Sequence, residues 1–343
     1  MKEDCRARGW AIVGLGKHAD VYLAPAIQQA CGARLVAVCS RSMAKAEAFA
    51  TKHKAERSYD SFERLLTDTQ VEVIAIATPN SMHGDQTVRA AQAGKHVLCE
   101  KPMATTVTEG ERMIEACRKN GVKLGIGFQN RHHPAHQEAQ RLIASGALGD
   151  ITYASAQYAH GKIGVSLTGW RADPEISGGG GSLYGSGLHC LDLLRFLIGK
   201  EVEEVVAVTD VGQPGRLVDE IVLTILKFGN GTFGYAASGL HIPRSCNDVA
   251  VYGTKARITG TGTVGTQLRG ELGVDSNGLV TRSEFPVTDP ICGLYVRQVE
   301  AFGRSIAENT EPDASGLDGL AMVRVARAVL ESSRTGRAVQ VTN

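Results

Sequence analysis

Five short apolar runs in the first 128 residues are separated by segments in which apolar residues recur at helical spacing. The runs are WAIVG (10–14), RLVAVC (34–39), VEVIAIA (71–77), HVLCE (96–100) and KLGIGF (123–128), with helices expected near 19–31, 42–53, 60–67, 84–94 and 105–120. Strands that alternate with helices form parallel sheets. The runs are apolar almost throughout, as expected of strands covered on both faces. The pattern predicts an α/β doubly wound parallel sheet.

The character of the sequence changes after about residue 150. Strand-like runs then follow one another with little helix between them, at 151–159, 203–210, 220–228, 232–239, 248–253 and 256–260. Helical spacing returns near 183–198, 294–308 and 316–334. This part is expected to form an α+β domain with an open, largely antiparallel sheet. Because 343 residues are many for one core, we expect two domains, 1–128 and 129–343.

The balance of charge argues against nucleic-acid and membrane partners. The chain has 37 basic and 36 acidic residues and a net charge of +1, which gives no attraction to polyanions. Its eight cysteines include no CxxC pair, as is usual in a reducing compartment. The charged N-terminus does not resemble a signal peptide, and no apolar run is long enough to span a membrane. We therefore expect a cytoplasmic protein.

A glycine-rich turn follows the first apolar run. Gly14, Gly16, Lys17, His18 and Ala19 form a GxGxxA pattern between a predicted strand and a predicted helix. In such a turn the first glycine permits the tight bend, the second lets a pyrophosphate approach, and the small third residue packs helix on strand. The amides at the helix start bind the phosphates. The alternative is a plain strand–turn–helix without a ligand.

The end of the second predicted strand indicates which dinucleotide is bound. An NAD site usually has an acidic residue there, which accepts hydrogen bonds from the ribose 2′-hydroxyl. This chain has Ser40 and Arg41 instead. A guanidinium binds a 2′-phosphate in fork geometry, so the sequence favours NADP. The alternative is an exposed arginine beside an NAD site that tolerates it.

The stretch GGGGSLYGSGLHCLD (178–192) contains four consecutive glycines, His189 and Asp192. Glycine costs roughly 0.5–1 kcal/mol relative to alanine within a regular element. The run is therefore either a hinge or a place where the backbone approaches something closely. We expect Gly178–Gly181 to bring the backbone against a bound ligand.

Several motifs together resemble one known family. They are Cys99-Glu100-Lys101-Pro102-Met103, Ala77-Thr78-Pro79-Asn80-Ser81-Met82-His83, Trp170-Arg171 and the glycine run that continues to His189 and Asp192. With the GxGxxA turn, they resemble the Gfo/Idh/MocA oxidoreductases over essentially the whole chain. The resemblance implies an NAD(P)-binding Rossmann domain at 1–128 and a substrate-binding and oligomerisation domain at 129–343.

The resemblance also implies a nicotinamide cofactor, NADP in preference to NAD, and a sugar- or polyol-like substrate. Lys101 is expected to reach the reacting oxygen, and the Lys101–Pro102 peptide is expected to be cis. The remaining cofactor contacts are expected from Thr78, Pro79, Asn80, His83 and Glu100. Trp170, Arg171, Tyr184, Asn130 and Arg131 are candidates for the substrate pocket. A core position for Trp170 and a role as a surface cation for Arg171 are equally open.

The sequence departs from the family at one catalytic position. The family usually has an Asp four residues before the histidine, and this chain has Gly185. His189 suits proton transfer because its ordinary pKa lies near working pH, although it could also be a satisfied histidine at a helix start. Asp192, three residues on, lies on the same helical face. We expect it to orient His189, with substrate binding as the competing role.

The predicted function is that of an NADP-preferring dehydrogenase or reductase, with Lys101, His189 and Asp192 as catalytic residues. The alternatives are an NAD-dependent glycoside hydrolase with a transient oxidation and a non-catalytic NADP-binding regulator. A homodimer or homotetramer through the C-terminal sheet is expected. No metal site is expected: His132, His133 and His136 lack a completing carboxylate or thiol and are assigned to a solvated helix start.

Overall fold

The computed structural model describes residues 7–285 and 292–342 of the chain. The chain divides into two compact units, Met1–Gln129 with Ile291–Leu320 and Asn130–Pro290 with Ala321–Asn343. The sequence-based division at residue 128 assigned everything beyond it to one domain. In the structure a late segment groups with the first unit, because helix α9 (Gly293–Glu308) packs its apolar face on helix α1 (Ala24–Gln29).

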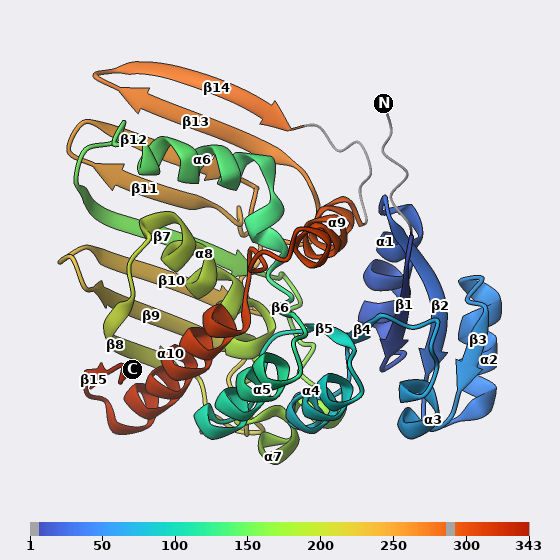
Figure 1. Ribbon diagram of the computed structural model, residues 1–343. Coiled ribbons are helices and arrows are strands. Elements are labelled where there is room, and N and C mark those ends of the chain that lie inside the picture. The colour runs from blue at the N-terminus through green and yellow to red at the C-terminus, as the bar shows by residue number, and fades with distance from the viewer. Residues whose placement is uncertain (1–6, 286–291, 343) are drawn as a thin grey trace, which may run out of the picture. The chain divides into compact units, whose positions relative to one another are not determined.

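The described part of the first unit contains a six-stranded parallel sheet (Figure 1). Its strands are β1 (Arg8–Val13), β2 (Ala33–Cys39), β3 (Arg57–Tyr59), β4 (Val73–Ile76), β5 (His96–Cys99) and β6 (Leu124–Ile126). The spatial order is β3-β2-β1-β4-β5-β6, with parallel pairing throughout. This is the strand order of dinucleotide-binding folds. The predicted doubly wound sheet is confirmed.

The helices of the first unit are α1, α2 (Met43–Lys52), α3 (Phe62–Leu66), α4 (His83–Gln92), α5 (Val107–Lys119) and α9, with a π-helical turn at Ala19–Leu23 before α1. Short polar side chains cap α2, α3 and α5. Ser42, Ser61 and Thr106 each accept a hydrogen bond from a backbone N–H three residues on, which satisfies a donor that the helix leaves open. The sequence missed β3 because its three residues carry no apolar run.

The described part of the second unit contains a nine-stranded sheet in the order β14-β13-β12-β11-β7-β10-β9-β8-β15. The strands are β7 (Ile151–Ala159), β8 (Val202–Thr209), β9 (Ile221–Phe228), β10 (Phe233–Gly239), β11 (Val249–Gly253), β12 (Ala256–Thr261), β13 (Gly270–Ser276), β14 (Leu279–Phe285) and β15 (Val339–Gln340). Pairing is antiparallel except between β7 and β10. The predicted largely antiparallel sheet is confirmed. The sequence missed β13–β15, of which β14 is almost wholly exposed and shows no apolar alternation.

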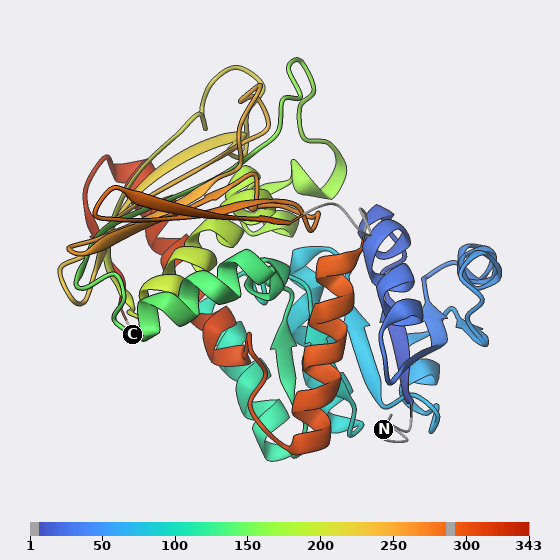
Figure 2. The same cartoon turned by 90° about the horizontal axis from the view of Figure 1, so that it is seen from above.

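One face of this sheet is covered by helices. Helices α6 (Pro134–Ala144), α8 (Leu188–Ile198) and α10 (Gly316–Thr335) lie along it, while the short α7 (Pro174–Ser177) precedes the glycine run (Figures 1 and 2). The burial of β9 alternates strictly along the strand, with every second residue buried, as expected of a sheet with one covered and one open face. Within the part of the chain that the structure describes, no helix combines the length and apolar character needed to cross a membrane.

Candidate active site

The glycine turn has the geometry that a dinucleotide requires. Gly14 has φ +93°, and a Cβ there would lie 2.6 Å from the backbone at Ala77 and Thr78, so only glycine fits between β1 and the end of β4. A Cβ on Gly16 would meet no heavy atom within 4 Å, which leaves this side of the turn open. Ala19 is fully buried, as expected of the residue that packs helix on strand. The residues present therefore fit a pyrophosphate at the helix start.

A hydrogen bond joins the glycine turn to the end of β5. His18 Nε2 lies 2.8 Å from Glu100 Oε1, and the imidazole packs edge-on against Tyr295 of α9 at 5.4 Å between ring centroids. Burial alone would raise the pKa of Glu100, but the neighbouring His18 and Lys101 outweigh it and lower that pKa. Glu100 is therefore ionised at neutral pH. Two predicted cofactor contacts, His18 and Glu100, thus hold one another in place.

The imidazole of His83 has a different role from the expected cofactor contact. Its Nδ1 lies 2.7 Å from the carbonyl oxygen of Pro102, and its Nε2 lies 3.0 Å from that of Thr78. The residue is only 1% exposed, and burial lowers its pKa. His83 therefore links the backbone after β4 to the backbone after β5. The Lys101–Pro102 peptide in this second segment is cis, as the resemblance implied.

The remaining residues predicted after β4 lie beside this link. Thr78 Oγ1 donates to Gln86 Oε1 at 2.7 Å, and Asn80 begins a short 3-10 turn in which it is buried. Pro79 and Lys101 are partly exposed. All of them follow the carboxyl ends of parallel strands, where doubly wound folds bind ligands.

Ser40 and Arg41 follow the carboxyl end of β2. Ser40 N–H donates to Tyr59 O at 3.0 Å, which fixes the backbone there. The Arg41 side chain is exposed. Ser42, the next residue, caps α2 by accepting from Lys45 N–H. A guanidinium thus stands at the strand end where NAD sites usually place a carboxylate.

Backbone angles and contacts within the second unit account for several glycines of the run. Gly178 and Gly179 have φ of +84° and +93°, a region that disfavours side chains. A Cβ on Gly180 would lie 2.9 Å from the Tyr184 ring, and one on Gly181 would lie 2.1 Å from Asp219 O. Neighbouring protein atoms fill the space at Gly180 and Gly181, so protein packing explains glycine at these two positions. The approach of the run to a bound ligand stays a prediction. Tyr184 itself is buried.

The position at which the family has an aspartate is open. A Cβ on Gly185 would meet no heavy atom within 4 Å, and Gly185 is exposed. The volume that a side chain would take is therefore available.

The carboxylate of Asp192 is bonded to Arg131. Arg131 Nε donates to Asp192 Oδ2 at 2.9 Å, and Nη2 donates to Oδ1 at 2.5 Å. Arg131 is 4% exposed and Asp192 is 1% exposed. This buried ion pair joins helix α8 to the turn that contains Arg131. The predicted orientation of His189 by Asp192 and the predicted binding of substrate by Arg131 stay predictions.

The three histidines after β6 are buried, which corrects their assignment to a solvated helix start. His136 Nδ1 faces Asn130 O at 2.7 Å and its Nε2 faces Thr263 Oγ1 at 2.9 Å. Burial lowers the pKa of His136 to about 3, so the ring stays neutral. His133 Nε2 lies 2.9 Å from Arg269 O. Asn130, a predicted substrate contact, accepts from Gly265 N–H with its side chain at 3.1 Å.

These contacts shape a polar cavity of about 140 Å³ close to His189. It is lined by Tyr158, His160, Asn247, Gly262, Val264, Gly265, Thr266, Gln267 and Arg269. The ring centroids of Tyr158 and His189 are 5.9 Å apart, and His160 Nε2 lies 3.4 Å from Ser186 Oγ, on the turn before α8. The sequence analysis missed these residues because they come from three separate segments that carry no common motif.

Trp170 and Arg171 lie together in a 3-10 turn before α7. The Arg171 guanidinium stands over the Trp170 ring, 4.4 Å from its centroid. Arg171 is exposed and Trp170 partly exposed, so neither belongs to the core.

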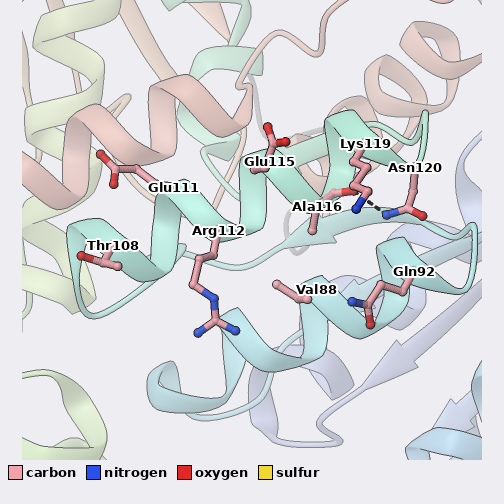
Figure 3. Close-up of a pocket in the computed structure, with 9 residues that line it drawn as sticks. All are labelled: Val88, Gln92, Thr108, Glu111, Arg112, Glu115, Ala116, Lys119 and Asn120. Atoms are coloured by element: carbon pink, nitrogen blue, oxygen red, sulfur yellow. Dashed lines mark hydrogen bonds between the residues drawn. The ribbon is translucent and has the colours of Figure 1, made fainter.

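A larger groove of about 580 Å³ lies elsewhere, between α4 and α5 (Figure 3). It is lined by Val88, Gln92, Thr108, Glu111, Arg112, Glu115, Ala116, Lys119 and Asn120. None of the sequence-predicted site residues lines it. We therefore do not assign the active site to this groove, although its volume is the larger.

Comparison with known proteins agrees with this geometry. Residues 8–128 match the oxidoreductase family with an NAD-binding Rossmann fold, and residues 136–259 match the GFO/IDH/MocA C-terminal domain. The 1,5-anhydro-D-fructose reductase of Ensifer adhaerens is 30% identical over 334 residues, 97% of this chain and 98% of that protein. The D-xylose 1-dehydrogenase (NADP(+)) 2 of Haloferax volcanii is 29% identical over 92% of this chain and 94% of its own length.

A solved structure gives the same result for the whole chain. The aldose-aldose oxidoreductase of Caulobacter crescentus, crystallised with glycerol, has a TM-score of 0.88 and 31% identity, and the match covers 98% of this chain and 100% of that one. With the glycine turn, the EKP segment and both domains in place, the chain belongs to the Gfo/Idh/MocA family of NAD(P)-dependent oxidoreductases.

Proposed function

We propose that this protein is an NADP-preferring oxidoreductase that transfers a hydride between nicotinamide and a secondary alcohol or carbonyl of a sugar- or polyol-like molecule. The observation that carries the proposal is the polar cavity beside His189. Sugars are recognised by hydrogen bonds to several hydroxyls, and a pocket gains specificity from a few well-placed polar groups.

The chemistry of the cavity supports a polyhydroxylated substrate. Phenol, imidazole, carboxamide and hydroxyl groups line it, from Tyr158, His160, Asn247, Thr266 and Gln267. These side chains can donate and accept in several directions. Two relatives are named for reactions on 1,5-anhydro-D-fructose and D-xylose, which belong to the same chemical class.

The preference for NADP rests on Arg41. Its exposed guanidinium follows β2, where a carboxylate would select the ribose 2′-hydroxyl of NAD. A cation there attracts the 2′-phosphate that distinguishes NADP. The Haloferax relative carries NADP(+) in its name.

The bound nicotinamide supplies or accepts the hydride. We assign Lys101 the role of stabilising negative charge on the reacting oxygen with its ammonium group. We assign His189 the role of moving the hydroxyl proton. The buried ring of His83 lies between Thr78 O and Pro102 O, within hydrogen-bond distance of both, and as a neutral imidazole donates to one of them, which steadies the backbone on which Lys101 stands.

We propose an assembly through the open face of the nine-stranded sheet. Exposed apolar side chains gather there on neighbouring strands: Tyr153, Val206, Val208, Leu223, Ile225 and Phe233. Monomeric proteins rarely expose contiguous apolar patches of this kind. A second copy of the chain, as a dimer or within a tetramer, is the expected partner.

The test is a spectroscopic screen at about 340 nm, with NADPH and NADP, against a panel of aldoses, anhydrosugars and polyols. We expect turnover of at least one sugar-like compound. Lys101→Ala should lower kcat by roughly 10²–10³-fold while NADPH affinity, measured by fluorescence titration, stays near the wild-type value. Turnover only of non-hydroxylated carbonyl compounds would contradict the proposed substrate class, and normal kcat in Lys101→Ala would contradict its role.

A further inference from the structure

Asp219 lies just before β9 and holds three successive backbone amides. Its Oδ1 accepts from Gly181 N–H at 2.9 Å, its Oδ2 accepts from Leu183 N–H at 2.6 Å, and its carbonyl oxygen accepts from Ser182 N–H at 2.7 Å. Asp219 is fully buried. The amides at the start of a helical segment have no partners within it. One residue therefore supplies acceptors to the start of the segment that leads to α8.

The segment beyond these amides carries His189 without a break. A π-helical turn at Leu183–Gly187 continues directly into α8, and His189 is in the first turn of that helix. The same helix is held further on by the buried pair of Arg131 and Asp192. A displacement of Leu183 would therefore move the turn on which the imidazole stands.

We propose that Asp219 is a positioning residue for His189, acting through the backbone at the start of the helical segment that carries the imidazole. This inference rests on the proposed role of His189 in proton transfer. A Cβ on Gly181 would lie 2.1 Å from Asp219 O, so this contact requires glycine at position 181.

The electrostatic surroundings of Asp219 make its hydrogen bonds sensitive to pH. Burial, and to a smaller extent Asp210, raise the pKa of Asp219 to about 6. The charged and titratable groups around it are Asp210, Arg216, Glu220, His241, Tyr184 and, beside Tyr184, Arg327. Arg216 pairs with Asp210 and Glu220, and His241 pairs with Glu220. Burial raises the pKa of Tyr184 to about 12, so its hydroxyl stays protonated.

Lowering the pH affects the stability of the whole fold and the strength of these local hydrogen bonds in opposite directions. The pKa of Asp219 in the fold is about 6, above its ordinary value of 3.8, so this group's contribution to stability is present at low pH and lost as the pH rises through about 6. Protonation nevertheless weakens acceptance by the carboxylate, because bonds to a charged acceptor are the stronger ones. Acidification should therefore loosen the held amides without destabilising the fold through this group.

The test is hydrogen–deuterium exchange on the full chain, followed by mass spectrometry of peptides that cover residues 181–183. Rates are compared at about pH 5 and about pH 7.5 after correction for intrinsic exchange, on either side of the pKa of Asp219. In the wild type we expect exchange to be roughly 10- to 100-fold faster at the lower pH, the range for losing one bond to a charged group. In Asp219→Asn exchange should be fast at both pH values. Asp68→Asn is the matched control, because Asp68 is a buried carboxylate of the first unit that also accepts from a backbone amide, Gln70 N–H.

A measurement of kcat tests whether the hydrogen bonds from Asp219 to these amides affect the function of His189. Asp219→Asn should lower kcat by roughly 10- to 100-fold through misplacement of the imidazole, with KM for NADPH unchanged. Equal protection of residues 181–183 in the wild type and in Asp219→Asn would overturn the inference, because the hydrogen bonds from Asp219 to these amides would then contribute nothing. Normal kcat in Asp219→Asn would also overturn it. If no sugar is turned over at all, the proposed function fails, while the exchange data still decide whether Asp219 holds the segment.

Discussion

The two glycines of the turn after β1 differ in their surroundings. Gly14 is fixed by its backbone angle and by contact with Ala77, whereas Gly16 faces open space. His83 shows the limit of such reasoning, since the motif placed it beside the cofactor and the fold uses it to join two backbone segments. Arg41 is the residue on which the choice of cofactor depends, because it is exposed at the end of β2.

Arg41→Ala should weaken NADPH binding and leave NADH binding nearly unchanged. Losing one charge-assisted contact to the 2′-phosphate costs roughly 1.5–3 kcal/mol, or about 10- to 100-fold in Kd. Fluorescence titration with both cofactors measures this directly. Arg118→Ala, which removes an exposed guanidinium paired with Glu115 on α5, is the control and should alter neither affinity. Equal affinity of the unmodified protein for the two cofactors would contradict the preference.

Helix α8 depends on side chains from distant parts of the second unit. The π-helical turn that leads into it is held at its start by Asp219, and Asp192 within α8 is bonded to Arg131. A buried ion pair contributes little net stability compared with apolar residues, yet removing one partner leaves an uncompensated charge. Asp192 is therefore expected to matter first for the placement of the helix.

Asp192→Asn should destabilise the protein by about 3–5 kcal/mol, because the Arg131 guanidinium would stay buried without its counter-charge. Urea unfolding measures this. The double variant Arg131→Met with Asp192→Leu should lose less stability than Asp192→Asn alone, since it buries no charge. A single variant within about 1 kcal/mol of wild type, smaller than the cost of an unpaired buried charge, would show that water reaches the pair.

At the scale of the whole molecule, the open sheet face is the feature without a covering layer in the described chain. Val206 lies opposite Ile225 and Val208 opposite Leu223, so the exposed apolar side chains of β8 and β9 are contiguous. The buried residues of the same strands face the helices instead. The sheet thus has one face for its own core and one suited to a second copy.

Ile225→Lys should convert the assembly to monomers without changing the circular dichroism spectrum. Burying an unpaired ammonium costs several kcal/mol, so we expect self-association to weaken by at least about 100-fold. Sedimentation velocity over a range of concentrations measures the change. Leu317→Lys, at an exposed apolar position of α10, should leave the assembly intact. An unmodified protein that is monomeric at all concentrations would refute the proposed interface.

The sequence by itself determined the alternation of strands and helices, the glycine turn and the segments that follow β4 and β5. These features are set by local rules, namely apolar periodicity and the backbone angles that glycine allows. The tertiary structure alone decided which partners the polar residues have. Asp192 bonds to a residue 61 positions away, and the amide of Gly181 bonds to one 38 positions away. The cavity beside His189 is likewise assembled from the end of β7 and the residue after it, from Asn247 in the segment before β11, and from the loop before β13. Burial makes such pairings obligatory, because a buried polar group without a partner is costly, but only the packed chain determines which groups meet.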